Sequence, residues 1–258
     1  MQKLLLALPL LSVACSYPRF YADKTIEQQL PLAAASQLSC TTHNGNIEVT
    51  GEPGLDHIEL RADIRVRGHT QEEADDRLGL VSVGHKIDGD TVKIFREYDR
   101  KEFRINSPTF TFTLRVPERL AMQLLTHNGN VQVSGTRGAL TAESHNGDIQ
   151  GSVRHQRARL ETHNGEIDVQ IAASGDLDAR IESHNGGIEI AVPEDAAGWI
   201  EASTHNGSIS GPDGVEDTES ARSRFRGRLG PAATEGVLRI ETHNGSISVR
   251  RADGAKPN

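Results

Sequence analysis

The sequence contains few aromatic residues and has no excess of positive charge. Phe, Trp and Tyr make up 4 % of its 258 residues, whereas 25 glycines are spread through the chain. This composition favours a β-rich fold with a core of Val, Ile, Leu and Thr, and it argues against a helical bundle. The formal net charge is −8, so we predict that the protein does not bind nucleic acid.

Sequence motifs of catalysis are also missing. The chain has no Gly-x-Ser-x-Gly, no P-loop and no paired-cysteine motif. An enzyme that cleaves polysaccharides on a β-helix needs a non-repeated cluster of acids or bases in a groove, and here the acids follow a repeat. We therefore predict that the protein is not an enzyme, and a polysaccharide-active β-helix is the least favoured alternative.

No apolar run is long enough to span a bilayer. Leu4 to Val13 is a run of ten, which is the length of the hydrophobic part of a signal peptide. It ends in Leu11-Ser-Val-Ala-Cys15, which resembles a bacterial lipobox. The resemblance implies that residues 1–14 are a signal peptide, removed to leave a lipidated Cys15 that anchors the protein in the cell envelope. Ser16 after the cysteine would favour the outer membrane of a Gram-negative bacterium, on its periplasmic or surface face.

Cysteine is too scarce for a disulfide framework. If Cys15 is acylated, Cys40 is alone in the mature chain. Cys40 alternates with Leu38 and Thr42, so we predict a small core residue. Residues 15–36 hold Pro18, Pro31 and an alanine run without a sustained period, and they are predicted to be the lipidated cysteine and a tether.

What the chain does contain is a four-residue motif, Thr/Ser-His-Asn-Gly, that occurs seven times. From His127 the steps to the next motif are 18, 18, 21, 21 and 38 residues. A fixed period of this length is typical of stacked repeats, which place equivalent residues in columns. The predicted corner residues are His43, Asn44, Gly45, His127, Asn128, Gly129, His145, Asn146, Gly147, His163, Asn164, Gly165, His184, Asn185, Gly186, His205, Asn206, Gly207, His243, Asn244 and Gly245.

The strands before each motif have a consistent facing. In 238–243, Leu238, Ile240 and Thr242 share one face, and Arg239, Glu241 and His243 share the other. The apolar face must be the inner one, so Thr/Ser points inward and the Glu and His columns point outward. Asn-Gly suits a corner because Gly accepts positive φ and Asn tolerates the left-handed region.

The recurrence of identical residues at one corner favours a β-solenoid over a meander of hairpins. Stacked asparagines can hydrogen-bond along a ladder, and we expect the inward hydroxyls to do the same. The prediction is an all-β fold, a single-stranded β-helix-like solenoid with coils of about 18–21 residues stacked over 123–250. An insertion at about 211–234 stands where one further motif would be due, and 251–258 is a tail.

Residues 37–122 are predicted to be an irregular β part that begins with the first repeat, which we expect to cap the stack. Thr70 and Glu73 make a capping box that starts a short helix through about Leu78. Residues 83–95 resemble a hairpin around Asp88-Gly89.

The ordered set of motifs is similar to a known group. It comprises Thr42-His-Asn-Gly-Asn-Ile-Glu-Val49, Gln71-Glu-Glu-Ala-Asp-Asp-Arg-Leu78, Leu114-Arg-Val-Pro117 and Leu238-Arg-Ile-Glu-Thr-His-Asn-Gly-Ser-Ile-Ser248. Over residues 36–250 the chain resembles the bacterial putative-adhesin family of unknown function, whose members are β-solenoids. The resemblance implies adhesion and carries no catalytic residues. A histidine before nearly every Asn-Gly departs from the family's usual Thr/Ser-x-Asn-Gly.

The predicted function is therefore that of a lipid-anchored, non-enzymatic scaffold or adhesin-like protein of the cell envelope. Its partners would be the membrane, through Cys15, and an envelope protein or polysaccharide. The alternative is binding of Zn²⁺, Cu²⁺ or Ni²⁺ by neighbouring columns. The densest candidate set is His145, His163, His184, Glu143, Glu161 and Glu182.

The lipobox generates a direct prediction. The mature protein should partition into the detergent phase on phase separation, and Cys15→Ser should move it to the aqueous phase, since no acyl chain can then be attached. Fractionation followed by immunoblotting measures this. Membrane retention of the Cys15→Ser protein would reveal a different anchor.

Overall fold

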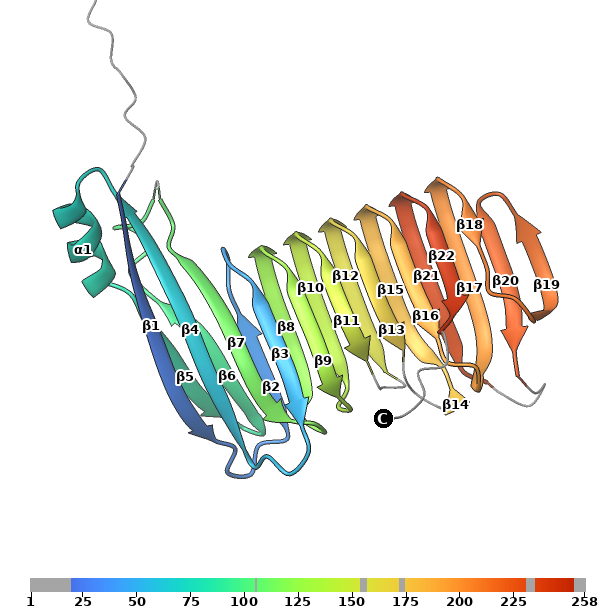
Figure 1. Ribbon diagram of the computed structural model, residues 1–258, viewed down its shortest axis with the longest axis horizontal. Helices are drawn as coiled ribbons and strands as arrows, with labels where there is room; N and C mark the ends of the chain where they lie inside the picture. The colour runs from blue at the N-terminus through green and yellow to red at the C-terminus, as the bar shows by residue number, and fades with distance from the viewer. Residues whose placement is uncertain (1–19, 105, 154–156, 172–174, 231–234, 253–258) are drawn as a thin grey trace, which may run out of the picture.

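The computed structural model describes residues 20–104, 106–153, 157–171, 175–230 and 235–252. The predicted signal peptide, Cys15 and the tail beyond residue 252 lie outside these residues. The described chain is nearly all β, and its strands form two facing sheets that run the length of an elongated stack (Figure 1). The apolar side chains of both sheets pack between them in one core.

Sheet A has ten strands within the described residues. In spatial order they are β1 (Phe20–Pro31), β4 (His57–Gly68), β7 (Thr109–Pro117), β3 (Ile47–Glu52), β9 (Val131–Thr136), β11 (Ile149–Val153), β13 (Ile167–Ile171), β16 (Ile188–Val192), β22 (Ile247–Arg251) and β18 (Ile209–Ser210).

Sheet B runs beside it. Its order is β19 (Glu216–Ala221), β20 (Arg224–Leu229), β17 (Ala196–Asn206), β21 (Val237–Asn244), β15 (Asp178–Asn185), β12 (Ala158–Asn164), β10 (Leu140–Asn146), β8 (Ala121–Asn128), β2 (Gln37–Thr41), β6 (Thr91–Glu97) and β5 (Ser82–Asp88). The short β14 (Gly175–Asp176) pairs with β17.

Each motif forms the corner between a strand of sheet B and a strand of sheet A, which confirms the predicted solenoid. The seven coils are β2–β3, β8–β9, β10–β11, β12–β13, β15–β16, β21–β22 and β17–β18. Strands of neighbouring coils pair parallel and in register, so that Leu160 lies beside Ala142 on one side and Ile181 on the other. The predicted facing is also confirmed, because these residues and the Thr/Ser of every motif are buried.

The spatial order of the coils differs from their order in the chain at one end. The last coil, β21–β22, inserts between β15–β16 and β17–β18 (Figure 1). The predicted insertion at 211–234 forms the hairpin β19–β20, and β20 pairs antiparallel with β17. Because this hairpin occupies one edge of β17, the last coil pairs with the other edge. The segment in which a further motif would be due therefore forms a hairpin that covers a sheet edge.

The N-terminal part is more regular than expected. The predicted hairpin is present as β5 and β6. β6 pairs parallel with β2, and β7 pairs parallel with β3. The pair β6–β7 thus forms an eighth coil that lacks the motif, and the first repeat is an internal member of the stack instead of a cap.

The prediction of a tether over residues 15–36 is wrong for residues 20–31. They form β1, which pairs antiparallel with all of β4. Its outward side chains form cross-strand ion pairs, Asp23 with Arg65 at 2.7 Å and Glu27 with Arg61 at 2.9 Å. These charges set the register and blunt an exposed sheet edge.

The predicted helix is confirmed as α1 (Gln71–Gly79). Thr70 accepts a hydrogen bond from the Glu73 amide at 3.1 Å, and the Glu73 carboxylate accepts one from the His69 amide at 2.8 Å. At the other end, Lys24 of β1 donates to the Leu78 carbonyl at 2.9 Å. Among the described residues no helix is long and apolar enough to cross a membrane.

The facing of the sheets predicts how two adjacent positions respond to substitution. Ile167 is 1 % exposed, whereas the neighbouring Glu166 is exposed. Ile167→Asp should cost more than about 4 kcal/mol, because it buries an unpaired carboxylate. Glu166→Gln should stay within about 0.5 kcal/mol of the parent. Urea unfolding of both variants measures the difference, and equal losses would contradict the assigned facing.

Candidate functional site

The histidines of the seven motifs form one continuous column on the outer face of sheet B. Successive imidazole rings lie 4.5 to 5.0 Å apart between centroids, with interplanar angles of 1° to 9°. The column runs in the order His43, His127, His145, His163, His184, His243 and His205. Parallel strand pairing at about 4.8 Å sets this spacing. The rings cover each other's faces and leave their edges toward solvent.

The asparagines form the predicted ladder beside the histidines. Each side-chain amide donates to the asparagine carbonyl oxygen of the preceding coil in the stack, at 2.7 to 2.8 Å. The ladder begins at Asn44, which accepts from Asn128, and it ends at Asn206, which donates to Asn244. In the internal coils, each asparagine side chain therefore donates one hydrogen bond through its NH₂ group and accepts one through its carbonyl oxygen.

The inward hydroxyls do not bond to one another, and the expected hydroxyl ladder is wrong. Six of them donate instead to a glycine carbonyl of the adjacent coil, as Thr162 does to Gly147 at 2.8 Å and Ser183 to Gly165 at 3.1 Å, and the seventh, Thr42, donates to the Phe110 carbonyl of the coil β6–β7 at 3.2 Å. A backbone carbonyl lies closer to each hydroxyl because the glycine corner comes within contact distance of the next coil. These bonds satisfy buried hydroxyls that would otherwise destabilise the core.

Close approach between coils also explains the glycines. A Cβ on Gly165 would lie 2.2 Å from the Gly147 carbonyl oxygen, and one on Gly186 would lie 1.8 Å from that of Gly165. The left-handed conformation expected from the sequence occurs at Gly45 and Gly147, with φ of 121° and 156°. None of the motif asparagines has positive φ. Glycine is required at this corner chiefly because there is no room for a side chain.

A groove runs along sheet B between the histidine column and the column two residues before it. Its volume is about 770 Å³, and it spans the six coils from β8 to β17. The second column contains Leu125, Glu143, Glu161, Glu182, Glu241 and Ser203. We call this feature the column groove. All six residues of the predicted metal set line it.

The groove carboxylates differ in their ion pairing. Arg159 donates to Glu161 at 3.0 Å, and Arg180 is ion-paired with Glu182. Glu143 and Glu241 form no ion pair within the described residues. Sequence reasoning missed these arginines, although an Arg two residues before a Glu on one strand face was a visible signal. The groove therefore combines neutralised carboxylates with two free ones.

In the described residues the imidazole rings of the column are parallel and do not point toward a common centre. Two imidazole nitrogens bind one metal ion at about 2.0–2.1 Å only if they point toward a common centre. Ring nitrogen lone pairs lie in the ring plane, and these planes are parallel. Within the part of the chain that the structure describes, no group of three His, Cys, Asp or Glu residues is arranged to hold an ion.

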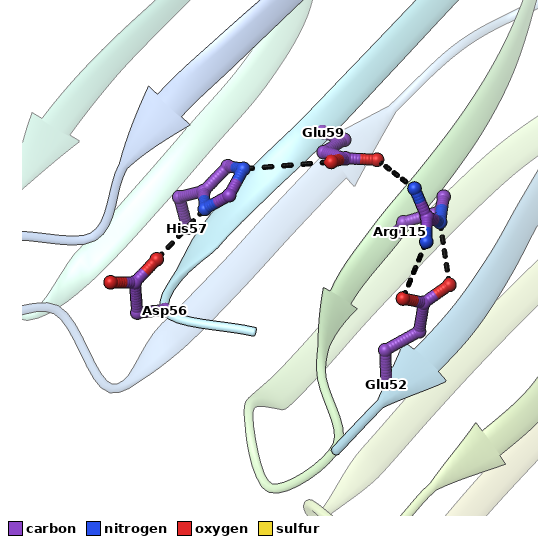
Figure 2. Close-up of polar contacts among 5 residues, drawn as sticks. All are labelled: Glu52, Asp56, His57, Glu59 and Arg115. Carbon is purple, nitrogen blue, oxygen red and sulfur yellow. Dashed lines mark hydrogen bonds and ion pairs between the residues drawn. The ribbon is translucent and has the colours of Figure 1, made fainter. Parts of the chain in front are cut away.

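A second polar cluster lies where the parallel stack meets the antiparallel strands of sheet A (Figure 2). Arg115 of β7 donates to Glu52 of β3 at 2.5 and 2.6 Å, and it is ion-paired with Glu59 of β4. His57 lies 2.8 Å from Asp56, and this contact lowers the pKa of Asp56. The two carboxylates raise the pKa of Arg115. These side chains pair with one another, so the cluster stabilises the junction between the two parts of sheet A.

Comparison with known proteins agrees with this architecture. The family described as Toastrack DUF4097 matches residues 9–198. A solved structure described as a putative cell adhesion protein from Clostridium sporogenes is 10 % identical, has a TM-score of 0.50, and covers 90 % of this chain and 100 % of its own. A putative adhesin from Bacteroides fragilis is 15 % identical, has a TM-score of 0.35, and covers 89 % and 97 %. No curated protein sequence matches.

These comparisons confirm the predicted family resemblance and fold class. At such low identity the Clostridium structure shows a shared fold alone. Neither the family nor these two structures are described as enzymes.

The corner geometry predicts the effect of adding one methyl group. Gly165→Ala should destabilise the protein by about 1–3 kcal/mol, because the Cβ overlaps the Gly147 carbonyl of the next coil. Gly79→Ala is the matched control, since its Cβ meets nothing within 4 Å, and it should be neutral or slightly stabilising. Thermal unfolding compares the two. A neutral Gly165→Ala would show that the coils do not approach this closely.

Proposed function

We propose a binding function for this chain, which belongs to the Toastrack DUF4097 family. In this proposal it is a lipid-anchored, non-enzymatic protein of the cell envelope, and it binds an extended polysaccharide in the column groove. The observation that carries the proposal is the continuity of that groove across six coils. A long open groove with equivalent groups at each step suits an extended, repeating ligand.

The chemistry of the lining supports a hydroxyl-rich polymer. Each imidazole presents its edge, where one ring nitrogen can donate a hydrogen bond and the other can accept one. Carboxylates such as Glu143 and Glu241 accept hydrogen bonds from hydroxyl groups. Leu125 is the one large apolar side chain of the lining, so the groove offers little to a lipid or to an apolar peptide face.

The regularity of the groove supports binding without catalysis. General acid–base chemistry on a glycosidic bond needs two carboxyl groups in different environments on either side of that bond. Glu161 and Glu182 instead occupy equivalent positions, and each has an arginine two residues earlier. The coils of Glu161 and Glu182 therefore present the same polar surface, which favours repeated weak contacts over one reactive centre.

Lipidation at Cys15 would place one end of the stack close to the membrane. Four residues, 16–19, separate this cysteine from β1. Such a segment spans at most about 18 Å, far less than the tether expected from the sequence. The anchor would therefore hold the β1 end near the bilayer, while the column groove extends away from the attachment point along the stack.

Binding to immobilised bacterial polysaccharides, neutral and acidic, tests the proposal. The variant Glu143→Ala/His163→Ala/Glu241→Ala should weaken binding at least tenfold, because it removes hydrogen-bonding groups from three coils. The control Gln150→Ala/Asp168→Ala changes the outer face of sheet A and should bind like the parent. Unfolding curves of all proteins verify that they are folded.

Two outcomes would contradict the proposal. Equal polysaccharide binding by the groove variant and the control would exclude the column groove as the site. Failure to bind any polysaccharide, together with groove-dependent capture of an envelope protein, would replace the polysaccharide with a protein partner.

A further inference from the structure

The eighth coil, β6–β7, differs from the others at its corner. Where they have Thr/Ser-His-Asn-Gly, it has the longer segment between Glu97 and Thr109, which carries Arg100 and Arg104. The strand register places Arg96 at the end of β6, one residue beyond the pair Phe95 and Thr41. In this register Arg96 continues the inward Thr/Ser column, and the segment that follows it carries Arg100 and Arg104 where the other coils have the histidine corner.

This corner borders a small, open cavity at the head of the histidine column. The cavity has a volume of about 210 Å³, and its lining includes His43, Arg96, Tyr98, Arg100, Arg104 and Ser107. One side of His43 stacks on His127 at 4.6 Å, and the cavity lies beside the same histidine. We call it the arginine pocket.

Arg96 lacks the partners that a guanidinium in this position needs. Its Nη1 atom is buried and has no hydrogen-bond partner in the structure. Burial lowers the pKa of Arg96, and the nearby charge of Arg100 lowers it further. An unsatisfied donor on a charged group costs more than one on a neutral group. The Tyr98 ring, 5.7 Å from the guanidinium carbon, explains where the side chain lies but does not satisfy the N–H group.

The carboxylates of this region do not neutralise the pocket. The Glu97 side chain accepts a hydrogen bond from Ser82, and that of Asp99 accepts one from the Lys101 amide. None of the three arginines forms an ion pair with the described residues. By contrast, Arg115 and Arg180 of the sheet faces are ion-paired. Three like charges around one cavity repel one another, and a bound anion would offset that repulsion.

We propose that the arginine pocket binds one oxyanion group, a phosphate or a carboxylate, carried by an acidic polysaccharide. Guanidinium forks recognise such groups by paired hydrogen bonds, and the buried Nη1 of Arg96 supplies a donor that an oxyanion oxygen would satisfy. Ser107 and the edge of His43 add neutral donors. The inference that a polysaccharide carries the anion rests on the proposed function, because the pocket lies in line with the column groove. The inference that the pocket binds an oxyanion does not rest on it.

Inorganic phosphate tests the pocket alone. Added phosphate should raise the melting temperature of the full mature chain above that in chloride of equal ionic strength, because a ligand stabilises the state that binds it. Arg96→Met should abolish this difference, and Arg100→Gln should reduce it. Arg119→Gln is the matched control, as Arg119 is 84 % exposed and lies outside the pocket.

The control also separates binding from a general salt effect. Phosphate stabilises many proteins by exclusion from their surface, and that effect would be equal in the parent, Arg96→Met and Arg119→Gln. Equal responses would therefore overturn the anion site. In chloride alone, Arg96→Met should melt no lower than the parent, because it removes an unsatisfied buried charge.

Paired polysaccharides test the ligand. Arg96→Met should bind a phosphorylated or uronic-acid polysaccharide at least tenfold more weakly than the parent and should bind a neutral one equally well. The column-groove variant should weaken both. Phosphate binding without any polysaccharide binding would leave the anion site intact and overturn the proposed function. Polysaccharide binding that depends on the column groove but is the same for Arg96→Met and for neutral and acidic polymers would support the proposed function and overturn the anion site.

Discussion

Main-chain hydrogen bonding between adjacent corners is the constraint on which the rest of the structure depends. The amides of six of the seven corner glycines donate to an asparagine carbonyl of the neighbouring coil, as Gly147 does to Asn164 at 3.0 Å. These bonds fix the coils at one parallel-strand spacing. At that spacing there is no room for a Cβ, the asparagine amides reach one another, and the imidazoles stack. The recurring motif is the set of residues compatible with this one distance.

The sequence was sufficient to predict the elements whose signal is local and repeated. The alternation in Leu238, Ile240 and Thr242 gave the facing of the strands, because a strand turns each successive side chain to the opposite face. Identity of the asparagine at every corner gave the ladder. The helix followed from Thr70 and Glu73, whose capping contacts lie within four residues of each other.

Elements specified by partners far away in the chain could not be predicted. β1 has polar residues, Lys24 and Gln28, at inward positions, so its hydrophobic alternation is broken. Its partner is the distant strand β4, where Arg61 and Arg65 form ion pairs with it. The order of the last two coils was also hidden. Coils with the same corner have equivalent strand edges, so their sequences do not show which coils are neighbours. The hairpin β19–β20 covers one edge of β17 and leaves the other edge for β21. Of the candidate site, the columns were predictable, but the arginine pocket was not, since it needs β6 beside β2.

The regular and irregular corners have complementary consequences for binding. A groove with equivalent groups on each coil can hold a repeating polymer in several registers of similar free energy, so it contributes affinity without fixing the polymer's position. The corner of β6–β7 is where the column stops and where charge gathers around Arg96. An anionic group bound there would select one register and one class of polymer. The repeat would then supply the length of the contact surface, and the single break in the repeat would supply its specificity.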